Sequence, residues 1–157
     1  MTFRLWHLAA LGSAALLIAA LGSQYLGGLA PCKMCIWQRW PHLVAVLAGV
    51  VLLFTKWRGF AFVGFVAALS TSGIGFFHAG VEQGWWEGPS TCSAPSIGSL
   101  STEALLDQIM NAPVVRCDEI AWSFAGLSMA AWNGVLSLGL AGLWALSLRQ
   151  SSNSASQ

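Results

Sequence analysis

The sequence predicts an all-α membrane protein, a four-transmembrane-helix bundle with two outward-facing cysteine loops. The composition supports this, because 56% of the 157 residues are hydrophobic and only 8% are charged, whereas about 25% of a soluble domain is charged. Four almost charge-free windows are each close to the roughly 20 residues that cross a bilayer. All six acids lie between Glu82 and Glu119, which leaves one sizeable polar segment outside the membrane.

The four windows cover about residues 5–26, 36–54, 60–81 and 121–148, within a single integral membrane domain over 1–157. The first window resembles a signal peptide in its basic start at Arg4 and in small residues near its end. Its apolar run is too long for a typical signal core, and its removal would leave three spans. We therefore interpret it as a membrane helix.

The basic residues predict the orientation of the bundle. Four of them lie without acids at the two termini and in the connection between the second and third spans, namely Arg4, Lys56, Arg58 and Arg149. By the positive-inside rule these segments face the cytoplasm. Both termini are then cytoplasmic, and the loops over about 27–35 and 82–120 face outward. No basic stripe typical of nucleic-acid binding is present.

The second outer loop contains one helical pattern, over about residues 102–111. Ser101 can cap this helix, and Pro113 ends it. One face is apolar and the other polar, so we expect a short amphipathic helix that rests on membrane lipid.

Small and polar residues inside the spans indicate how the helices pack. Gly64, Ala68 and Ser72 recur at intervals of four, a spacing that lets helix backbones approach closely in lipid. Asn133 lies in the middle of the fourth span, and we expect its amide to bond to another helix rather than face lipid.

The chemistry is predicted around Cys32 and Cys35, a Cys-x-x-Cys pair at the start of the second span. Two intervening residues allow the pair to open and close a disulfide by a small movement. Arg39 follows Cys35 by four positions, so in a helix its guanidinium shares the sulfur's face. A permanent cation there would stabilise a thiolate. Trp37 and Trp40 flank the pair, either as an aromatic belt or as pocket walls.

The chain's other two cysteines, Cys92 and Cys117, lie in the second outer loop. An even number of cysteines confined to loops suggests disulfides and an oxidising compartment. A zinc site is disfavoured because zinc ribbons use two Cys-x-x-Cys units. Inert structural disulfides remain an alternative, above all for Cys92 with Cys117. The third interpretation is two dithiol pairs that exchange electrons, with a mobile outer loop.

The electrons would then need an acceptor beyond the first pair. The sequence has no haem ligation pattern, iron–sulfur spacing or nucleotide-binding loop, so we expect a lipid-soluble acceptor beside Cys35 and Arg39 and no metal. His78, near the outer end of the third span, is a candidate hydrogen-bond donor or proton carrier. His42, one turn past Arg39, is a weaker candidate of the same kind.

The combined pattern resembles the bacterial disulfide bond formation protein family, DsbB. The likeness rests on Pro-Cys-x-x-Cys-x-x-x-Arg at residues 31–39, on His-Ala-Gly-Val-Glu-Gln-Gly-Trp-Trp at 78–86 and on Arg-Cys-Asp-Glu at 116–119. It implies a quinone-dependent thiol oxidase of the bacterial inner membrane with periplasmic cysteine loops. Its cofactor would be ubiquinone or menaquinone, drawn from the quinone pool. Its partner would be a DsbA-like periplasmic thiol oxidase.

The resemblance also implies roles for individual residues. Cys92 would form the mixed disulfide with the partner, and Cys117 would resolve it. Electrons would pass to Cys32 and Cys35, with Cys35 as the thiolate next to the quinone. Arg39 would stabilise that thiolate and the charge on the quinone. Gln38 stands where some relatives carry an acid, which bears on any proton role there.

Two other functions stay open at this point. The chain could be a non-enzymatic accessory protein of the membrane whose disulfides are structural. It could also be a relative of vitamin K epoxide reductase, although that family places Cys-x-x-Cys at the last helix of its bundle, and this chain places it before the second span.

Overall fold

The computed structural model describes residues 5–55, 57–90, 92, 103, 106, 110 and 115–153. Within these residues the chain forms α1 (Leu5–Tyr25), α2 (Lys33–Phe54), α3 (Gly59–Glu82), β1 (Ser123–Phe124), β2 (Leu127–Ser128) and α5 (Met129–Asn153). All four long helices are long and apolar enough to cross a membrane. The predicted four-helix membrane bundle is therefore confirmed.

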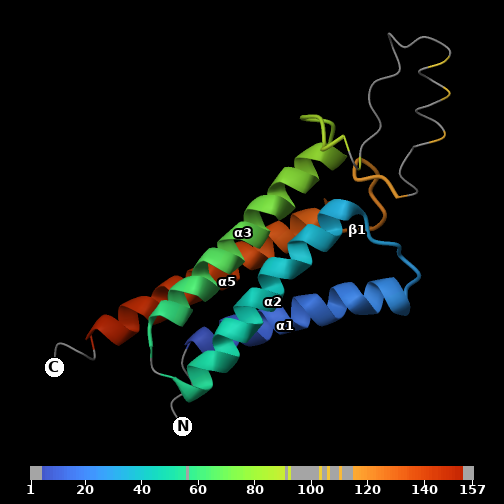
Figure 1. Cartoon of the computed structure of the whole chain (residues 1–157). Coiled ribbons are helices and arrows are strands. Elements are labelled where there is room, and N and C mark those ends of the chain that lie inside the picture. The colour runs from blue at the N-terminus through green and yellow to red at the C-terminus, as the bar shows by residue number, and fades with distance from the viewer. Residues whose placement is uncertain are drawn as a thin grey trace.

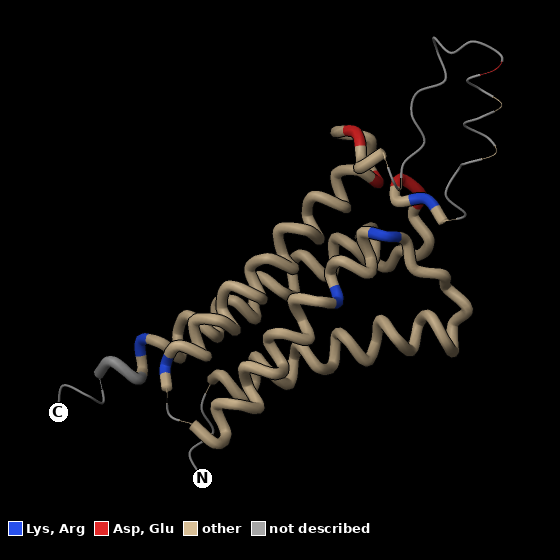
Figure 2. The backbone as a smooth tube through the Cα atoms, in the orientation of Figure 1, with Lys and Arg blue, Asp and Glu red and all other residues tan. Residues whose placement is uncertain are grey.

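The helices form a ring in which each packs on two neighbours (Figure 1). α1 packs on α2 and α5, and α3 packs on the same two helices from the other side. The described acids lie at the end of the bundle where α2 begins and α3 ends, as Figure 2 shows. That is the end that carries the cysteines.

Close contacts through small residues hold α3 against α5. A methyl group added at Gly75 would lie 2.8 Å from the backbone nitrogen of Gly134, so the two backbones nearly touch. At Gly64 the same addition would lie 2.6 Å from the ring of Trp144, which is fully buried. Ser72 Oγ donates to the carbonyl of Gly134 at 2.8 Å. These contacts confirm the predicted role of the small-residue pattern in packing.

The second helix begins at Lys33, three residues earlier than the sequence predicted. Cys32 is its N-cap residue, and its sulfur accepts a hydrogen bond from the backbone N–H of Cys35 at 3.2 Å. The sulfur thus satisfies a donor that the first helical turn leaves without a partner. Hydropathy alone gave a later start, because Lys33 interrupts the apolar run.

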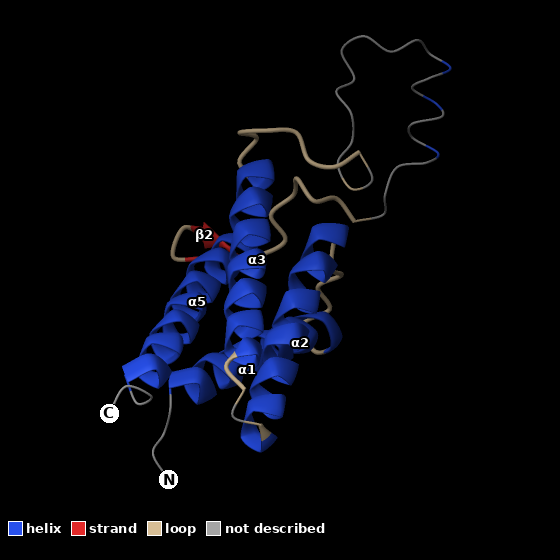
Figure 3. Cartoon of the chain, turned by 60° about the vertical axis from the view of Figure 1, so that its left-hand side comes forward, coloured by secondary structure: helices blue, strands red, loops and turns tan. Residues whose placement is uncertain are grey.

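The prediction that the fourth span begins near residue 121 was wrong. Residues 123–128 form a small hairpin, with Phe124 opposite Leu127, and α5 begins only at Met129 (Figure 3). Ala125 and Gly126 turn the chain with φ values of 51° and 79°, as a tight two-residue hairpin turn requires. Ser128 Oγ then accepts from the backbone N–H of Ala131 at 3.2 Å and caps the helix. Residues 121–128 are as apolar as a membrane helix, so hydropathy could not distinguish the hairpin from the start of the span.

The amphipathic surface helix predicted over about residues 102–111 lies mostly outside the described residues. It stays a prediction.

Candidate dithiol site

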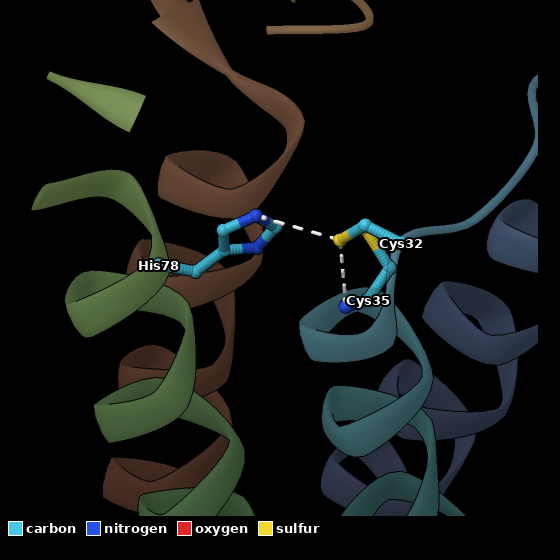
Figure 4. Close-up of side chains that lie close together, drawn as sticks. All are labelled: Cys32, Cys35 and His78. Atoms are coloured by element: carbon cyan, nitrogen blue, oxygen red, sulfur yellow. Dashed lines mark hydrogen bonds between the residues drawn. The ribbon is translucent and has the colours of Figure 1, made fainter. Parts of the chain in front are cut away.

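The first cysteine pair lies at the N-terminus of α2, with the Cys32 sulfur facing His78 of α3. Cys32 Sγ and Cys35 Sγ are 2.7 Å apart, and both cysteines are free thiols. Figure 4 shows His78 of α3 pointing at the pair from the opposite side. Its Nε2 lies 3.6 Å from Cys32 Sγ. The geometry therefore joins a dithiol and an imidazole from two neighbouring helices.

The surroundings of Cys32 favour its thiolate. The hydrogen bond from the Cys35 thiol holds the pKa of Cys32 well below its ordinary value, and the contact with His78 adds to this effect. The position at a helix N-terminus acts in the same direction. Burial opposes the shift but is outweighed. Cys32 is therefore the sulfur of the pair for which the structure provides stabilising partners.

The second pair, Cys92 and Cys117, is joined in a disulfide and lies directly against the first pair. Cys92 is 1% exposed and Cys117 is fully buried. Both pack in one cluster with Cys32 and with Val81 of α3. Four sulfurs that are far apart in the sequence thus share one buried region at the outer end of the bundle.

His78 links the two pairs. Besides its contact with Cys32, its Nε2 lies 3.1 Å from the backbone carbonyl oxygen of Cys117. The imidazole is 2% exposed. Glu82, one helical turn further along α3, lies 3.9 Å from the same nitrogen. A histidine singled out from its position in the sequence therefore occupies the junction of the two dithiols.

The guanidinium of Arg39, a residue of α2, bonds to α1 and not to a cysteine sulfur. Its guanidinium donates to Gln24 Oε1 at 2.5 Å and to the carbonyl of Ala20 at 3.2 Å. Within the described residues no hydrogen bond joins it to Cys32 or Cys35, whereas its buried Nε–H has no partner. The prediction that Arg39 stabilises a thiolate on Cys35 is thus not matched by a contact. The free N–H is suited to an acceptor atom of a ligand.

A cavity of about 620 Å³ opens beside the first pair, between α1, α2 and α5. Cys35, Arg39 and His42 of α2 line it together with His78 of α3. The remaining wall is largely apolar and includes Leu16, Ala20, Val115, Trp122, Met129 and Leu136. All three predicted ligand-binding residues, Arg39, His42 and His78, therefore line one cavity together with Cys32 and Cys35.

His42 takes part in a polar cluster below the pair. Its Nε2 lies 2.9 Å from Asn133 Oδ1. Asn133 Nδ2 in turn donates to Gln38 Oε1 at 2.7 Å. The prediction that Asn133 bonds across helices is confirmed. Gln38 then reaches His78 Nδ1 at 2.9 Å, so the cluster continues up to the dithiol site.

Trp37 and Trp40 do not line this cavity. They border a separate apolar groove of about 630 Å³ between α2 and α3, together with Pro41 and Phe62. Both indoles are exposed on the outer surface of the bundle, Trp40 by 63%. Their positions agree with aromatic residues at a membrane interface.

The residues of the first pair could also ligate a metal. One ligand atom from each of Cys32, Cys35 and His78 lies within 4.8 Å of the others. A structural zinc site takes four such ligands. Cys92 and Cys117 cannot complete one here, because their sulfurs bond to each other. The four-cysteine zinc alternative is therefore not supported.

An ion pair lies next to Cys117 on the surface. Arg116 Nη2 donates to Asp118 Oδ2 at 2.5 Å, and its Nε lies 3.5 Å from Glu119. The guanidinium keeps the pKa of Asp118 below its ordinary value, and the carboxylates raise that of Arg116. Both side chains are largely in solvent, so the pair contributes little to stability.

Sequence reasoning missed two residues of the site. Gln38 was noted only as a departure from relatives, and Glu82 only as the start of the polar segment. Polar residues at intervals of four inside apolar helices were the available signal. Gln38 precedes His42 by four positions, and His78 precedes Glu82 by four, so each pair shares one helix face.

The family model described as "Disulfide bond formation protein DsbB" matches residues 2–147. The chain belongs to the DsbB family. This confirms the resemblance found in the cysteine motifs, and membership supports a function in disulfide bond formation.

Curated relatives agree with the DsbB assignment. A protein named "Disulfide bond formation protein B" from a Polaromonas species is 35% identical, over 83% of this chain and 80% of its own. One of the same name from Polaromonas naphthalenivorans is 34% identical over 92% and 89%. "Disulfide bond formation protein B 2" from Pseudomonas aeruginosa is 32% identical over 82% and 79%. No solved structure matches the chain significantly.

Proposed function

We propose that this chain is a quinone-reducing protein-disulfide oxidoreductase that reoxidises a DsbA-like periplasmic thiol oxidase. The observation that carries the proposal is the packing of both cysteine pairs in one buried cluster beside a cavity. Structural disulfides would not need a free dithiol with a stabilised thiolate next to them. A relay of electrons from one pair to the other requires that arrangement.

The outer pair receives electrons from the partner. A partner thiolate attacks Cys92 Sγ, the Cys92–Cys117 bond breaks, and Cys117 leaves as a thiolate. The partner's second thiolate then attacks the mixed disulfide. This forms the partner's own disulfide and releases Cys92 as a thiolate. Because Cys92 is 1% exposed, its sulfur must first become accessible to the partner.

The inner pair receives the same two electrons next. The Cys117 thiolate attacks Cys32 of an oxidised Cys32–Cys35 disulfide, and Cys92 resolves the intermediate by re-forming the Cys92–Cys117 bond. His78 supports this assignment because it contacts the backbone of Cys117 and the sulfur of Cys32.

The cavity fits a quinone. Its walls are mostly apolar, as a quinone ring and its tail require. Its polar lining includes N–H groups that can donate a hydrogen bond to a carbonyl oxygen, such as the unpartnered Nε–H of Arg39. A bound ubiquinone or menaquinone supplies a two-electron, two-proton acceptor. Arg39 would orient and polarise one carbonyl oxygen. Cys35, which lines the cavity, would hold the sulfur that faces the ring.

The direction of electron flow requires such an acceptor. A DsbA-type oxidase has a reduction potential of about −120 mV, so few biological acceptors can reoxidise it. A quinone pool in the bilayer can do so, and the cavity opens within the membrane-spanning helices. The protein's disulfides act as relays and do not provide the driving force.

The site fits the bacterial inner membrane, with the cysteine end in the periplasm. Arg58 is the N-cap of α3 and Arg149 lies near the end of α5, so both lie at the opposite end of the bundle. The positive-inside rule places that end in the cytoplasm. Both termini then lie on the cytoplasmic side, and membrane lipid surrounds the four helices.

One assay tests the proposal. The purified protein is mixed with a reduced thioredoxin-fold oxidase and with ubiquinone or menaquinone, and thiol loss and quinone absorbance are followed together. We expect one quinone reduced for each partner disulfide formed. A protein that merely loses stability in reductant and reduces no quinone would instead be a membrane accessory protein with structural disulfides.

A further inference from the structure

We propose that Gln38 is a positioning residue that locks His78 in the neutral tautomer with its proton on Nε2. The imidazole is then a hydrogen-bond donor toward the dithiol and not a base. This inference rests on the proposed function, because it assigns His78 its role in the electron relay. Three independent sets of hydrogen bonds lead to it.

The first set concerns Nε2 of His78. It lies 3.1 Å from the carbonyl oxygen of Cys117, which can only accept a hydrogen bond. Nε2 must therefore carry a proton. The same N–H is within reach of Cys32 Sγ at 3.6 Å, so it can be shared with a thiolate there.

The second set concerns Nδ1 of His78. The side-chain nitrogen of Gln38 lies 2.9 Å from it. That nitrogen also donates to the carbonyl of Met34 at 3.2 Å, so the group facing this position is the amide NH₂ and not the oxygen. Nδ1 must therefore accept, and it carries no proton. The two ends of the ring require the same tautomer.

The third set prevents the Gln38 amide from reversing. The hydroxyl of Thr71 donates to the backbone carbonyl of Gln38 at 3.0 Å, which uses its single hydrogen. Thr71 Oγ1 can then only accept from Asn133 Nδ2, at 3.1 Å. The same Nδ2 donates to Gln38 Oε1 at 2.7 Å, which identifies that atom as the oxygen. A reversed amide would set two NH₂ groups against each other.

The titratable and charged groups around His78 do not alter this. Cys32 and Cys35 face it from the start of α2, and Glu82 lies 3.9 Å away on α3. Arg116 and Glu119 border the same cavity from the segment before α5. Cys32 and Glu82 approach Nε2, and Arg116 and Glu119 line the cavity. Among the described residues, Gln38 is the hydrogen-bond partner of Nδ1.

The consequence is a division of labour at the thiol pair. His78 donates an N–H to the sulfur that becomes a thiolate, and its second nitrogen is blocked. It cannot take a proton from Cys32, because neither ring nitrogen is a free acceptor. The thiol protons therefore leave toward the cavity without passing through His78.

The first test is ¹⁵N NMR of the histidine-labelled, reduced protein in detergent, with His78 assigned by a His78→Gln variant. We expect a protonated Nε2 and an unprotonated Nδ1 near neutral pH. In Gln38→Glu the carboxylate only accepts, so both nitrogens should be protonated. Gln83→Glu is the matched control, since Gln83 is exposed at the same end of the bundle, and it should look like wild type. Two results would overturn the proposal. One is a wild-type spectrum in which Nδ1 is protonated, and the other is a Gln38→Glu spectrum that is the same as the wild-type spectrum.

The second test is the rate of alkylation of Cys32 against pH. A cationic His78 in Gln38→Glu should move the half-maximal rate lower by about one pH unit, equivalent to tenfold in thiolate population, and Gln83→Glu should not. If Gln38→Glu fails to fold, Gln38→Leu replaces it. Without the amide donor, nothing blocks Nδ1, so Nδ1 should take up a proton at a higher pH than in wild type while Nε2 stays protonated. An Nδ1 that becomes protonated only at the same pH as in wild type would refute the role of Gln38. Neither test uses quinone or partner, so its result does not depend on turnover. If the proposed function is wrong, the wild-type protein will instead show no quinone reduction in the turnover assay.

Discussion

The two cysteine pairs differ in how the fold holds them. Cys32 and Cys35 lie three positions apart on the first turn of a long helix, where backbone geometry alone keeps their sulfurs close. Cys92 and Cys117 are 25 positions apart, and neither belongs to a helix. Tertiary packing against Cys32 and Val81 brings this second pair to the same place.

This difference fits the two different tasks that we propose for the pairs. A helix-borne pair keeps a fixed position relative to the cavity and to His78, as transfer to a bound acceptor requires. A loop-borne pair can be displaced without unfolding the bundle, as attack by a large partner requires. Variants that alter one pair, the cavity or the scaffold test this division.

Loss of the inner pair should abolish every activity. In Cys35→Ser, quinone reduction should fall at least about a thousandfold, because no second thiol remains to close the disulfide. The loss should be the same whether a protein partner or a small dithiol supplies electrons. Absorbance of the quinone is the measurement. Full activity in this variant would refute the assigned relay.

Loss of the outer pair should separate the two electron donors. In Cys92→Ser, reduction driven by the thioredoxin-fold partner should fall to background. Reduction driven by a small dithiol should persist, because Cys35 is partly exposed and can be reached directly. Both rates are measured on the same preparation. Equal losses with both donors would mean that the outer pair does not act as the entry point.

Arg39→Ala should weaken ligand binding without changing the thiol. Loss of a charged hydrogen bond predicts about a tenfold or greater rise in KM for quinone. The pH dependence of Cys35 alkylation should stay unchanged, since no hydrogen bond links Arg39 to a sulfur in the described residues. Lys33→Ala, which removes an exposed cation nearby, is the control. A shifted alkylation profile in Arg39→Ala alone would support the thiolate role that the sequence suggested.

Gly75→Ala should loosen the scaffold that holds His78. The added methyl group would collide with the backbone of Gly134, which predicts a loss of about 1–3 kcal/mol in stability. Thermal unfolding in detergent measures it. Gly73→Ala is the matched control, because nothing lies within 4 Å of its added carbon. If both variants melt alike, the close contact of α3 and α5 is not what stabilises the bundle.

Asp118→Asn should have the smallest effect. Arg116 lowers the pKa of Asp118, so the ion pair is complete above the ordinary Asp pKa of about 3.9 and is lost as the pH falls through the lower folded value. At neutral pH the variant should speed amide exchange at Cys117 by a few-fold at most. In acid the two proteins should converge. Glu87→Gln, which removes another exposed acid, should show no change at either pH.

Much of the bundle could be predicted because lipid imposes a simple rule on sequence. Each span needs about 20 apolar residues, and three of the four predicted windows agree with α1, α2 and α3 to within three residues at each end. The start of α5 could not be predicted, because the hairpin before Met129 is as apolar as the helix itself. Backbone turns depend on φ at Ala125 and Gly126, which hydropathy does not report.

The amino-acid sequence was enough to predict the four membrane-spanning helices, the candidate redox cysteines and the family. Those features depend on local composition and on short motifs, which are present before the chain folds. Only the tertiary structure decided which side chains meet. Arg39 bonds to α1 although its spacing from Cys35 suggested a sulfur, and His78 joins two pairs from far along the chain. The physical reason is that hydrogen bonds between helices depend on the rotation and depth of each helix, and packing of whole helix faces sets both.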